Sequence, residues 1–252
     1  GGRVAAAYVA GQPPDGYSLL VGAAGAMSVA PAIYPNLPYH PTRSFLPLTL
    51  IGSFPLVLTV SPKHAVESVA ELVAWAKANP DKANYATSAP GFTIATELLK
   101  LRTGMPGVAI PYKSSNESVL SVISGQTLLT IADPPPTVAL VKGGQLRALA
   151  VTGAKRLAEL PDVPSMAEVG LPDVNIGLWS GLFAPAGTPP AIAQKIEAEL
   201  RRAIQSPDVG DKLRALGVDP GGIPSDEFRR MIEADIKVTA VVVKAANLTF
   251  EE

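Results

Sequence analysis

Two short loops carry the groups that could bind a small anion. One runs from Gly22 to Ser28 and the other from Thr87 to Thr93, and neither contains Lys or Arg. Each loop follows a predicted strand. Where a strand leads through such a loop into a helix, backbone N–H groups and the helix dipole hold an anion without a basic side chain. The hydroxyls of Ser88 and Thr93 would add hydrogen-bond donors.

The same residue types also form ordinary turns and helix N-caps, and this alternative stays open for each loop taken alone. The presence of two such loops on separate predicted lobes favours a ligand site. Phe92 would either close over an apolar part of a ligand or fill the space beneath its loop. Trp179 lies between two glycines, Gly177 and Gly181, and is expected at a cleft or a hinge.

Motifs for catalysis and for common cofactors are missing. The chain has no G-x-x-x-x-G-K-[ST], no G-x-G-x-x-G and no H-E-x-x-H pattern. Its two histidines, His40 and His64, lie in unrelated segments, and Ser180 has the wrong spacing for a nucleophile elbow. There is no cysteine. We therefore predict a binding protein, not an enzyme, with no cofactor and no metal.

The composition narrows the class further. Hydrophobic residues make up 47% of the chain, charged residues 17%, and the formal net charge is −1. This balance predicts a folded protein and argues against nucleic-acid binding, which needs a concentrated basic surface. The longest apolar stretch, Leu19 to Tyr34, is broken by Pro31 and falls short of the ~20 residues that a membrane span requires. Direct membrane insertion is not expected.

Short apolar runs alternate with amphipathic segments, which is typical of an α/β fold with parallel strands. The tripeptide Pro134–Pro136 is expected to be a rigid loop. Strands are predicted at Tyr17–Val21, Leu56–Val60, Ala83–Tyr85, Leu128–Ile131, Leu146–Val151 and Gly181–Ala184. Helices are predicted after Ser68, over Ile94–Leu101, from Ser115 to Ser124, from Ser165 to Gly170, after Thr188, from Ser206 to Leu216 and after Ser225.

Seven segments in order resemble the extracytoplasmic solute receptors of tripartite tricarboxylate transporters, also known as Bug proteins. They are Pro14–Leu20, Tyr34–Pro41, Asn84–Ser88, Pro111–Lys113, Gly144–Thr152, Leu160–Pro164 and Trp179–Pro189. The resemblance implies a type II periplasmic-binding-protein fold, with two α/β lobes joined by crossing strands and a ligand cleft between them. Lobe one would comprise residues 1–55 and 179–252, and lobe two residues 56–178.

The resemblance also implies the function and the site. The protein would capture a small organic carboxylate in the periplasm and deliver it, as a monomer, to the permease subunits of the transporter. A sensing module of the same fold that signals to a kinase or regulator is the alternative. The expected ligand-binding residues are Ala24, Gly25, Ala26, Met27, Ser28, Ser88, Gly91, Phe92, Thr93, Asp133 and Trp179.

Two departures from the family pattern add expectations. The family begins with a strand, a loop and a helix that precede the start of this sequence, so we expect the natural chain, including its signal peptide, to be longer at its N-terminus. In the candidate loops, Ala24, Ala26, Met27 and Phe92 stand where relatives often have polar residues. This predicts a carboxylate with an apolar or aromatic body instead of a citrate-like ligand.

Overall fold

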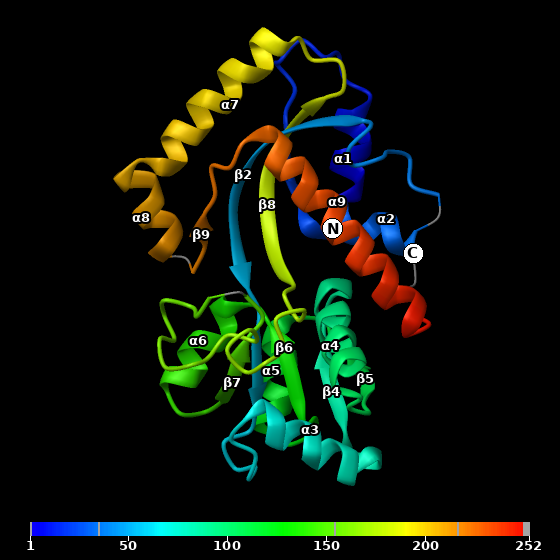
Figure 1. Ribbon diagram of the computed structural model, residues 1–252, viewed down its shortest axis with the longest axis vertical. Helices are drawn as coiled ribbons and strands as arrows, with labels where there is room; N and C mark the ends of the chain where they lie inside the picture. Colours follow the sequence, from blue (N-terminus) through cyan, green and yellow to red (C-terminus); the bar gives the residue numbers. More distant parts are fainter. Residues whose placement is uncertain (1, 35, 154, 216, 249–252) are drawn as a thin grey trace. The chain divides into compact units, whose positions relative to one another are not determined.

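The computed structural model describes residues 2–34, 36–153, 155–215 and 217–248. Pro35, within one of the family segments, and Leu216, at the predicted end of a helix, therefore lie outside the described residues. The chain divides into two compact units (Figure 1). Unit 1 comprises Gly1–Ser53 and Leu178–Glu252, and unit 2 comprises Phe54–Gly177. The chain passes from unit 1 to unit 2 near the end of one long strand and returns at the start of another.

Unit 1 contains a four-stranded sheet in the order β1-β8-β2-β9. Helices on both of its faces supply the packing. Its strands are β1 (Leu20–Ala23), β2 (Phe45–Pro55), β8 (Gly177–Pro185) and β9 (Asp219–Pro220). Its helices are α1 (Arg3–Ala10), the π-helix η1 (Gly25–Val29), α2 (Ala30–Ile33), α7 (Pro190–Gln205), α8 (Pro207–Ala215) and α9 (Ser225–Ala245).

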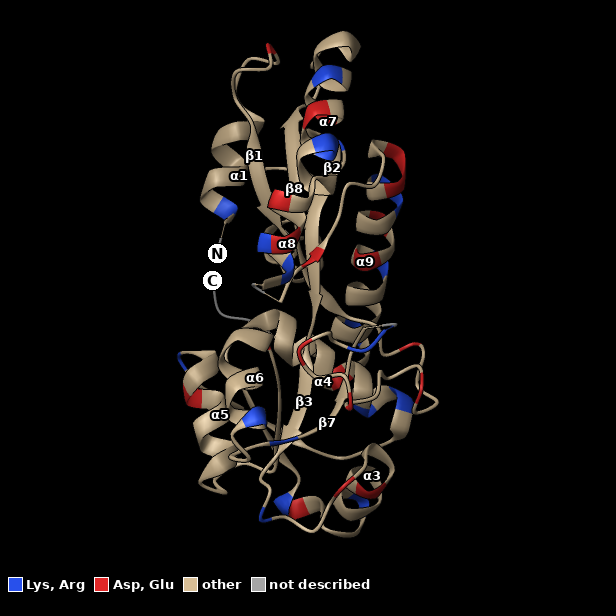
Figure 2. Ribbon diagram, turned by 90° about the vertical axis from the view of Figure 1, so that its left-hand side faces the viewer, with Lys and Arg blue, Asp and Glu red and all other residues tan. Residues whose placement is uncertain are grey.

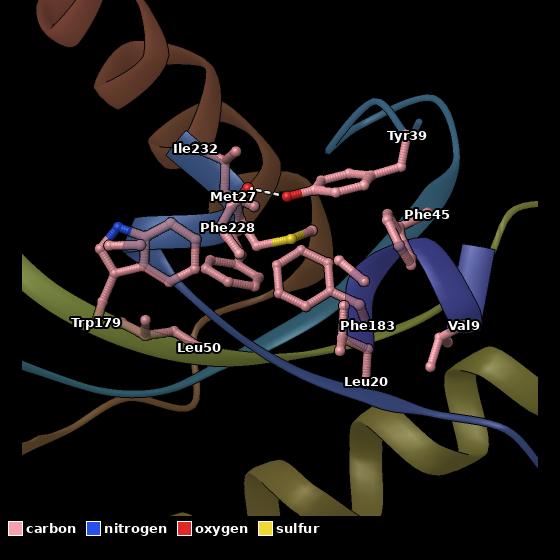
Figure 3. Packing of buried hydrophobic residues seen from close by; sticks show 13 residues of the cluster. Val9, Leu20, Met27, Tyr39, Phe45, Leu50, Trp179, Phe183, Phe228 and Ile232 are labelled. Atoms are coloured by element: carbon pink, nitrogen blue, oxygen red, sulfur yellow. Dashed lines mark hydrogen bonds between the residues drawn. The ribbon is translucent and has the colours of Figure 1, made fainter. Parts of the chain in front are cut away.

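The side chains of β8 show which face of this sheet α9 and α7 cover, because successive side chains of a strand point to opposite sides. Trp179 and Phe183 belong to the same apolar cluster as Phe228 of α9 (Figure 3). Leu182 and Ala184, at the alternate positions, pack in a second cluster with residues of α7. The α9 side holds the larger core, in which the rings of Phe183 and Phe228 lie 5.3 Å apart.

Unit 2 contains a five-stranded sheet in the order β5-β4-β6-β3-β7. Its strands are β3 (Val57–Val60), β4 (Asn84–Thr87), β5 (Val108–Pro111), β6 (Leu129–Ala132) and β7 (Arg147–Val151). Its helices are α3 (Val69–Ala78), the 3-10 turn η2 (Pro80–Lys82), α4 (Pro90–Thr103), α5 (Ser115–Ile123) and α6 (Pro134–Lys142).

Both sheets differ from the predicted parallel arrangement. Strands β4, β5 and β6 are parallel, whereas β3 runs antiparallel to β6 and β7, and the pairs β1–β8 and β2–β9 are antiparallel. Parallel neighbours need a crossover connection, usually a helix. Helices connect β4, β5 and β6, but a single residue, Leu56, separates β3 from β2.

Helix starts in unit 2 obey the capping rules that their sequences suggest. The Ser68 hydroxyl accepts the Glu71 N–H at 3.2 Å and caps α3, and Ser114 accepts the Glu117 N–H at 3.3 Å and caps α5. The expected helix from Ser165 to Gly170 is instead a single turn, although Ser165 and Glu168 make the reciprocal bonds of a capping box. The segment is too short to add a second helical turn.

The triproline segment and strand β2, which was not predicted, depart from the predicted elements. Pro134, Pro135 and Pro136 form the first turn of α6, not a loop. Proline is tolerated there because the first N–H groups of a helix have no intrahelical partner to lose.

Charged side chains of both signs alternate along α7 and α9 (Figure 2). Ion pairs such as Arg201–Glu197 in α7 and Arg230–Asp226 in α9 join side chains one turn apart. This interspersion matches the formal net charge of −1. None of the helices in the described ranges has the length and apolar character needed to cross a bilayer.

Candidate ligand-binding site

One edge of the unit 2 sheet gathers three helix N-termini. Strands β4, β5 and β6 are parallel, and each leads directly into a helix, namely α4, α5 or α6. The carboxyl ends of these three strands therefore lie together, and we refer to this end of the sheet as the carboxyl edge. In α/β sheets, ligands bind outside the carboxyl ends of strands, where loops turn into helices. The carboxyl edge is therefore our candidate site.

No side chain among the described residues accepts a capping hydrogen bond at the start of α4. Its N-cap is Ala89. Pro90, the first residue of α4, has no N–H, and the Phe92 N–H donates to the Ala89 carbonyl at 3.0 Å, so the Gly91 N–H is the backbone donor that this first turn leaves at the positive end of the helix dipole. Ser88 is thus not the cap of α4, which removes the ordinary structural explanation for its hydroxyl.

Two hydroxyls meet beside this helix start. The Oγ atoms of Ser88 and Ser115 lie 3.5 Å apart, and both residues are half-buried. Ser115 is the first residue of α5. Sequence reasoning identified it only as a helix start. Three residues separate Ser115 from the end of β5, and a prediction of that strand was the signal that could have placed it at the carboxyl edge.

The other polar residues of this loop are used within it. Thr87 and Thr93 are buried, and their hydroxyl oxygens lie 2.9 Å apart. Thr93 also donates to the Ala89 carbonyl at 3.3 Å. Phe92 is 6% exposed and packs in the interior of unit 2. In this structure Thr93 and Phe92 shape the loop, while Ser88 and Gly91 are its accessible predicted residues.

Asp133 directly follows β6 on the same edge and takes the N-cap position of α6. Its side chain makes no capping bond, and its Oδ1 is buried without a hydrogen-bond partner among the described residues. The residue as a whole is half-buried.

The first candidate loop, in unit 1, forms the π-helix η1. Ala24, Ala26, Met27 and Ser28 are all buried, whereas Gly25 is exposed and its Cα faces open space. The Ser28 hydroxyl donates to the Ala24 carbonyl at 3.0 Å. Of this loop, Ala23 and Gly25 are exposed to solvent, and Met27 belongs to the core of Figure 3.

Trp179 is also a core residue of unit 1. It is 3% exposed, and its ring packs edge-on against Phe228 with centroids 5.3 Å apart. Its indole Nε1–H donates to Asp235 Oδ2 at 2.6 Å. Burial raises the pKa of the Asp235 carboxyl above its usual range, and the Trp179 hydrogen bond opposes that shift. The indole donor is therefore already used inside the protein.

Unit 1 also carries a concavity of about 570 Å³ beside the starts of α7 and α9. Its polar groups are largely used by the protein. Thr188 donates to the Pro185 carbonyl, Ser225 to the Pro47 carbonyl, and Arg229 to the Thr42 carbonyl. Arg43 and Gln194 also line this concavity.

The carboxyl edge can therefore hold an anion through neutral donors. Its donors are the backbone N–H of Gly91 in α4 and the hydroxyls of Ser88 and Ser115. Over the described ranges, no three side chains from His, Cys, Asp and Glu come together as a candidate metal site.

Residues 1–248 match the family described as the tripartite tricarboxylate transporter family receptor. The chain belongs to this family, whose members are solute receptors. Protein BugT of Bordetella pertussis is 33% identical over 247 residues, which cover 97% of this chain and 76% of BugT.

Solved structures agree with the family match. Rpa4515 of R. palustris, determined with adipate, is 34% identical with a TM-score of 0.83, covering 98% of this chain and 84% of that chain. MatC from Rhodopseudomonas palustris, determined with bound malate, is 28% identical with a TM-score of 0.77, covering 96% and 84%. The α/β fold of this chain is that of the family's periplasmic binding proteins.

Proposed function

We propose that this protein is a periplasmic receptor that binds one small organic carboxylate and delivers it to the permease subunits of a tripartite tricarboxylate-type transporter. The observation that supports carboxylate binding is the uncapped start of α4 beside the Ser88 hydroxyl. A carboxylate there would accept hydrogen bonds from the Gly91 N–H and from the Ser88 hydroxyl. The bound acids of Rpa4515 and MatC support the same chemistry.

The role is binding and release, not turnover. The carboxyl edge supplies donors to a carboxylate, and Asp133 Oδ1 has no hydrogen-bond partner among the described residues with which to form an acid–base pair. The protein would act as a monomer. A periplasmic location agrees with the family to which the chain belongs.

The predicted ligand-binding residues fall into an accessible group and a buried group. Ser88, Gly91 and Asp133 on unit 2 are accessible, and the ligand would contact these residues. Gly25 is accessible on unit 1. The other predicted residues are buried within their own unit, Phe92 and Thr93 in unit 2 and Ala24, Ala26, Met27, Ser28 and Trp179 in unit 1. An apolar body on the ligand stays a prediction, because Met27 and Phe92, on which it rests, are buried here.

A thermal-shift screen against mono-, di- and tricarboxylates, both aliphatic and aromatic, tests this function. A ligand at 100 times its Kd stabilises the folded state by about 2.7 kcal/mol. At about 2–4 °C per kcal/mol for a chain of this size, the melting temperature rises by about 5–11 °C. A rise with one class of acid supports the receptor, and folded protein that responds to no acid contradicts it.

Ser88→Ala provides the site-specific test, with Ser206→Ala as a matched control. Ser88 would lose one donor to a charged group, which lowers affinity about tenfold or more. The Ser206 hydroxyl donates to the Ala203 carbonyl at the end of α7 in unit 1, so its removal leaves the affinity unchanged. Equal affinities in both variants would remove Ser88 from the site.

A further inference from the structure

Asp133 carries a carboxylate that the fold does not use. An Asp at an N-cap ordinarily accepts the backbone N–H of the second or third helical residue. In α6 those residues are Pro135 and Pro136, which have no N–H, and Pro134 precedes them. The ordinary role of this side chain is therefore chemically blocked by the three residues that follow it.

The consequence is visible in the hydrogen-bond pattern. Asp133 Oδ1 is buried and has no partner within the described chain, and no other buried side-chain oxygen or nitrogen described here shares that condition. A buried polar atom without a partner is unfavourable, and native structures nearly always satisfy such atoms. A donor from outside the chain would relieve this oxygen.

The position of Asp133 indicates where that donor comes from. In the β4–β6 register Ala86 pairs with Thr130, so the residues that follow the two strands, Ser88 and Asp133, leave adjacent strands at the same edge. Adjacent strands are about 4.8 Å apart. A carboxylate held at the start of α4 would place its neighbouring carbons near Asp133.

The negative charge of the Asp133 carboxylate then determines which functional group those ligand carbons can bear. A second carboxylate facing Asp133 would meet a like charge, whereas a hydroxyl or ammonium group would donate to the unpaired oxygen. Asp133 as a whole is half-buried, so part of the residue remains accessible.

We propose that Asp133 selects a carboxylic acid that bears a hydroxyl or ammonium group within a few carbons of its carboxylate. This inference rests on the proposed function, because it assumes that the carboxyl edge binds an acid. It adds a specificity-determining residue and a substrate class to that site.

Calorimetric titration of the full-length protein with matched acids tests the proposal. The probes are lactate against propionate, and malate against succinate, which differ by one hydroxyl. The wild type should bind the hydroxy acid about tenfold or more tightly, as expected for a hydrogen bond to a charged group. In Asp133→Asn this ratio should fall toward one, and succinate should bind more tightly than it does to the wild type.

A second variant removes the selectivity while keeping the charge. Pro136→Ala restores an N–H at the third residue of α6, which the Asp133 carboxylate would then cap. The hydroxy-acid preference should fall in this variant too, with the folded state confirmed by circular dichroism. Asp162→Asn is the matched control, since Asp162 lies in an exposed turn of unit 2, and it should keep the wild-type ratio.

The outcomes separate this inference from the proposed function. Acids that bind the wild type and Asp133→Asn with the same hydroxy-acid ratio would overturn the role of Asp133 and leave the receptor intact. Folded protein that binds none of the acids would contradict the receptor and the selectivity together.

Discussion

Replacing Trp179 by Phe tests whether this residue serves the core or the ligand. Its Nε1–H donates to Asp235 at 2.6 Å, which ties β8 to α9 inside unit 1. Phe retains an aromatic ring against Phe228 but removes the N–H donor. Asp235 would then keep a largely buried carboxylate without its indole partner.

The size of the effect follows from this contact. A hydrogen bond to a charged group contributes about 1.5–3 kcal/mol, and the smaller ring adds a packing loss of up to about 1 kcal/mol. We expect Trp179→Phe to lower the free energy of unfolding by about 2–4 kcal/mol at neutral pH. The melting temperature should fall by about 4–16 °C.

The pH dependence identifies the contact. Burial raises the folded-state pKa of Asp235 above the unfolded value of about 3.9. A group with a raised folded pKa contributes stability that is present below the unfolded pKa and is lost as pH rises through the folded pKa. Removing the Trp179 donor raises this pKa further, so the deficit of the variant grows from pH 4 to pH 7.5. Asp235→Asn should abolish that growth.

Urea unfolding of wild type, Trp179→Phe, Asp235→Asn and the double variant at pH 4 and pH 7.5 measures these quantities. Trp75→Phe is the matched control, because Trp75 in α3 is half-buried and packs edge-on against His64. A deficit that is the same at both pH values would refute the reasoning. A variant with wild-type stability and lost ligand affinity would make Trp179 a ligand residue.

Three further substitutions test the fold. Gly181→Ala should destabilise the protein by about 1–3 kcal/mol or more in thermal unfolding, because a Cβ there would lie 2.1 Å from the Phe228 ring, and a wild-type melting temperature would contradict the packing of β8 on α9. Tyr85→Phe should lower the free energy of unfolding by about 1.5–3 kcal/mol, since the buried Tyr85 hydroxyl donates to Glu97 at 2.6 Å, and an unchanged urea midpoint would exclude this bond. Ser114→Ala should reduce stability by about 1 kcal/mol through loss of the α5 cap, measured by the same unfolding curve, and no loss would show that the cap is replaceable.

Local signals in the sequence predicted much of the secondary structure. The pairs Ser68–Glu71 and Ser114–Glu117 each place a cap three residues from its acidic partner, so those helix starts depend on neighbours alone. The α/β class and the family were predicted from segments along the whole chain, and the comparisons confirm both.

Elements rich in proline escaped prediction. Strand β2 contains Pro47 and Gly52, which ordinarily argue against a strand interior, and sequence reasoning did not propose it. Its neighbours explain the exception: Ser225 donates to the Pro47 carbonyl, and the segment after β9 donates to β2. These partners lie far along the chain, where periodicity carries no information.

The residues of the candidate site also divide into those that local sequence signals could predict and those that depend on partners far along the chain. Ser88 could be identified because it directly follows a strand. The hydrogen bond from Trp179 to Asp235 could not be predicted, since 56 residues separate the two in the sequence. The unpaired oxygen of Asp133 was in principle readable, because the three prolines that block its cap are adjacent in sequence.

A crystal structure of the full-length protein with the acid found by the thermal-shift screen tests the central claim most directly. The account predicts the ligand carboxylate at the start of α4, within hydrogen-bond distance of the Ser88 hydroxyl. An acid bound elsewhere, for example in the unit 1 concavity beside Arg229, with the start of α4 left empty, would contradict it.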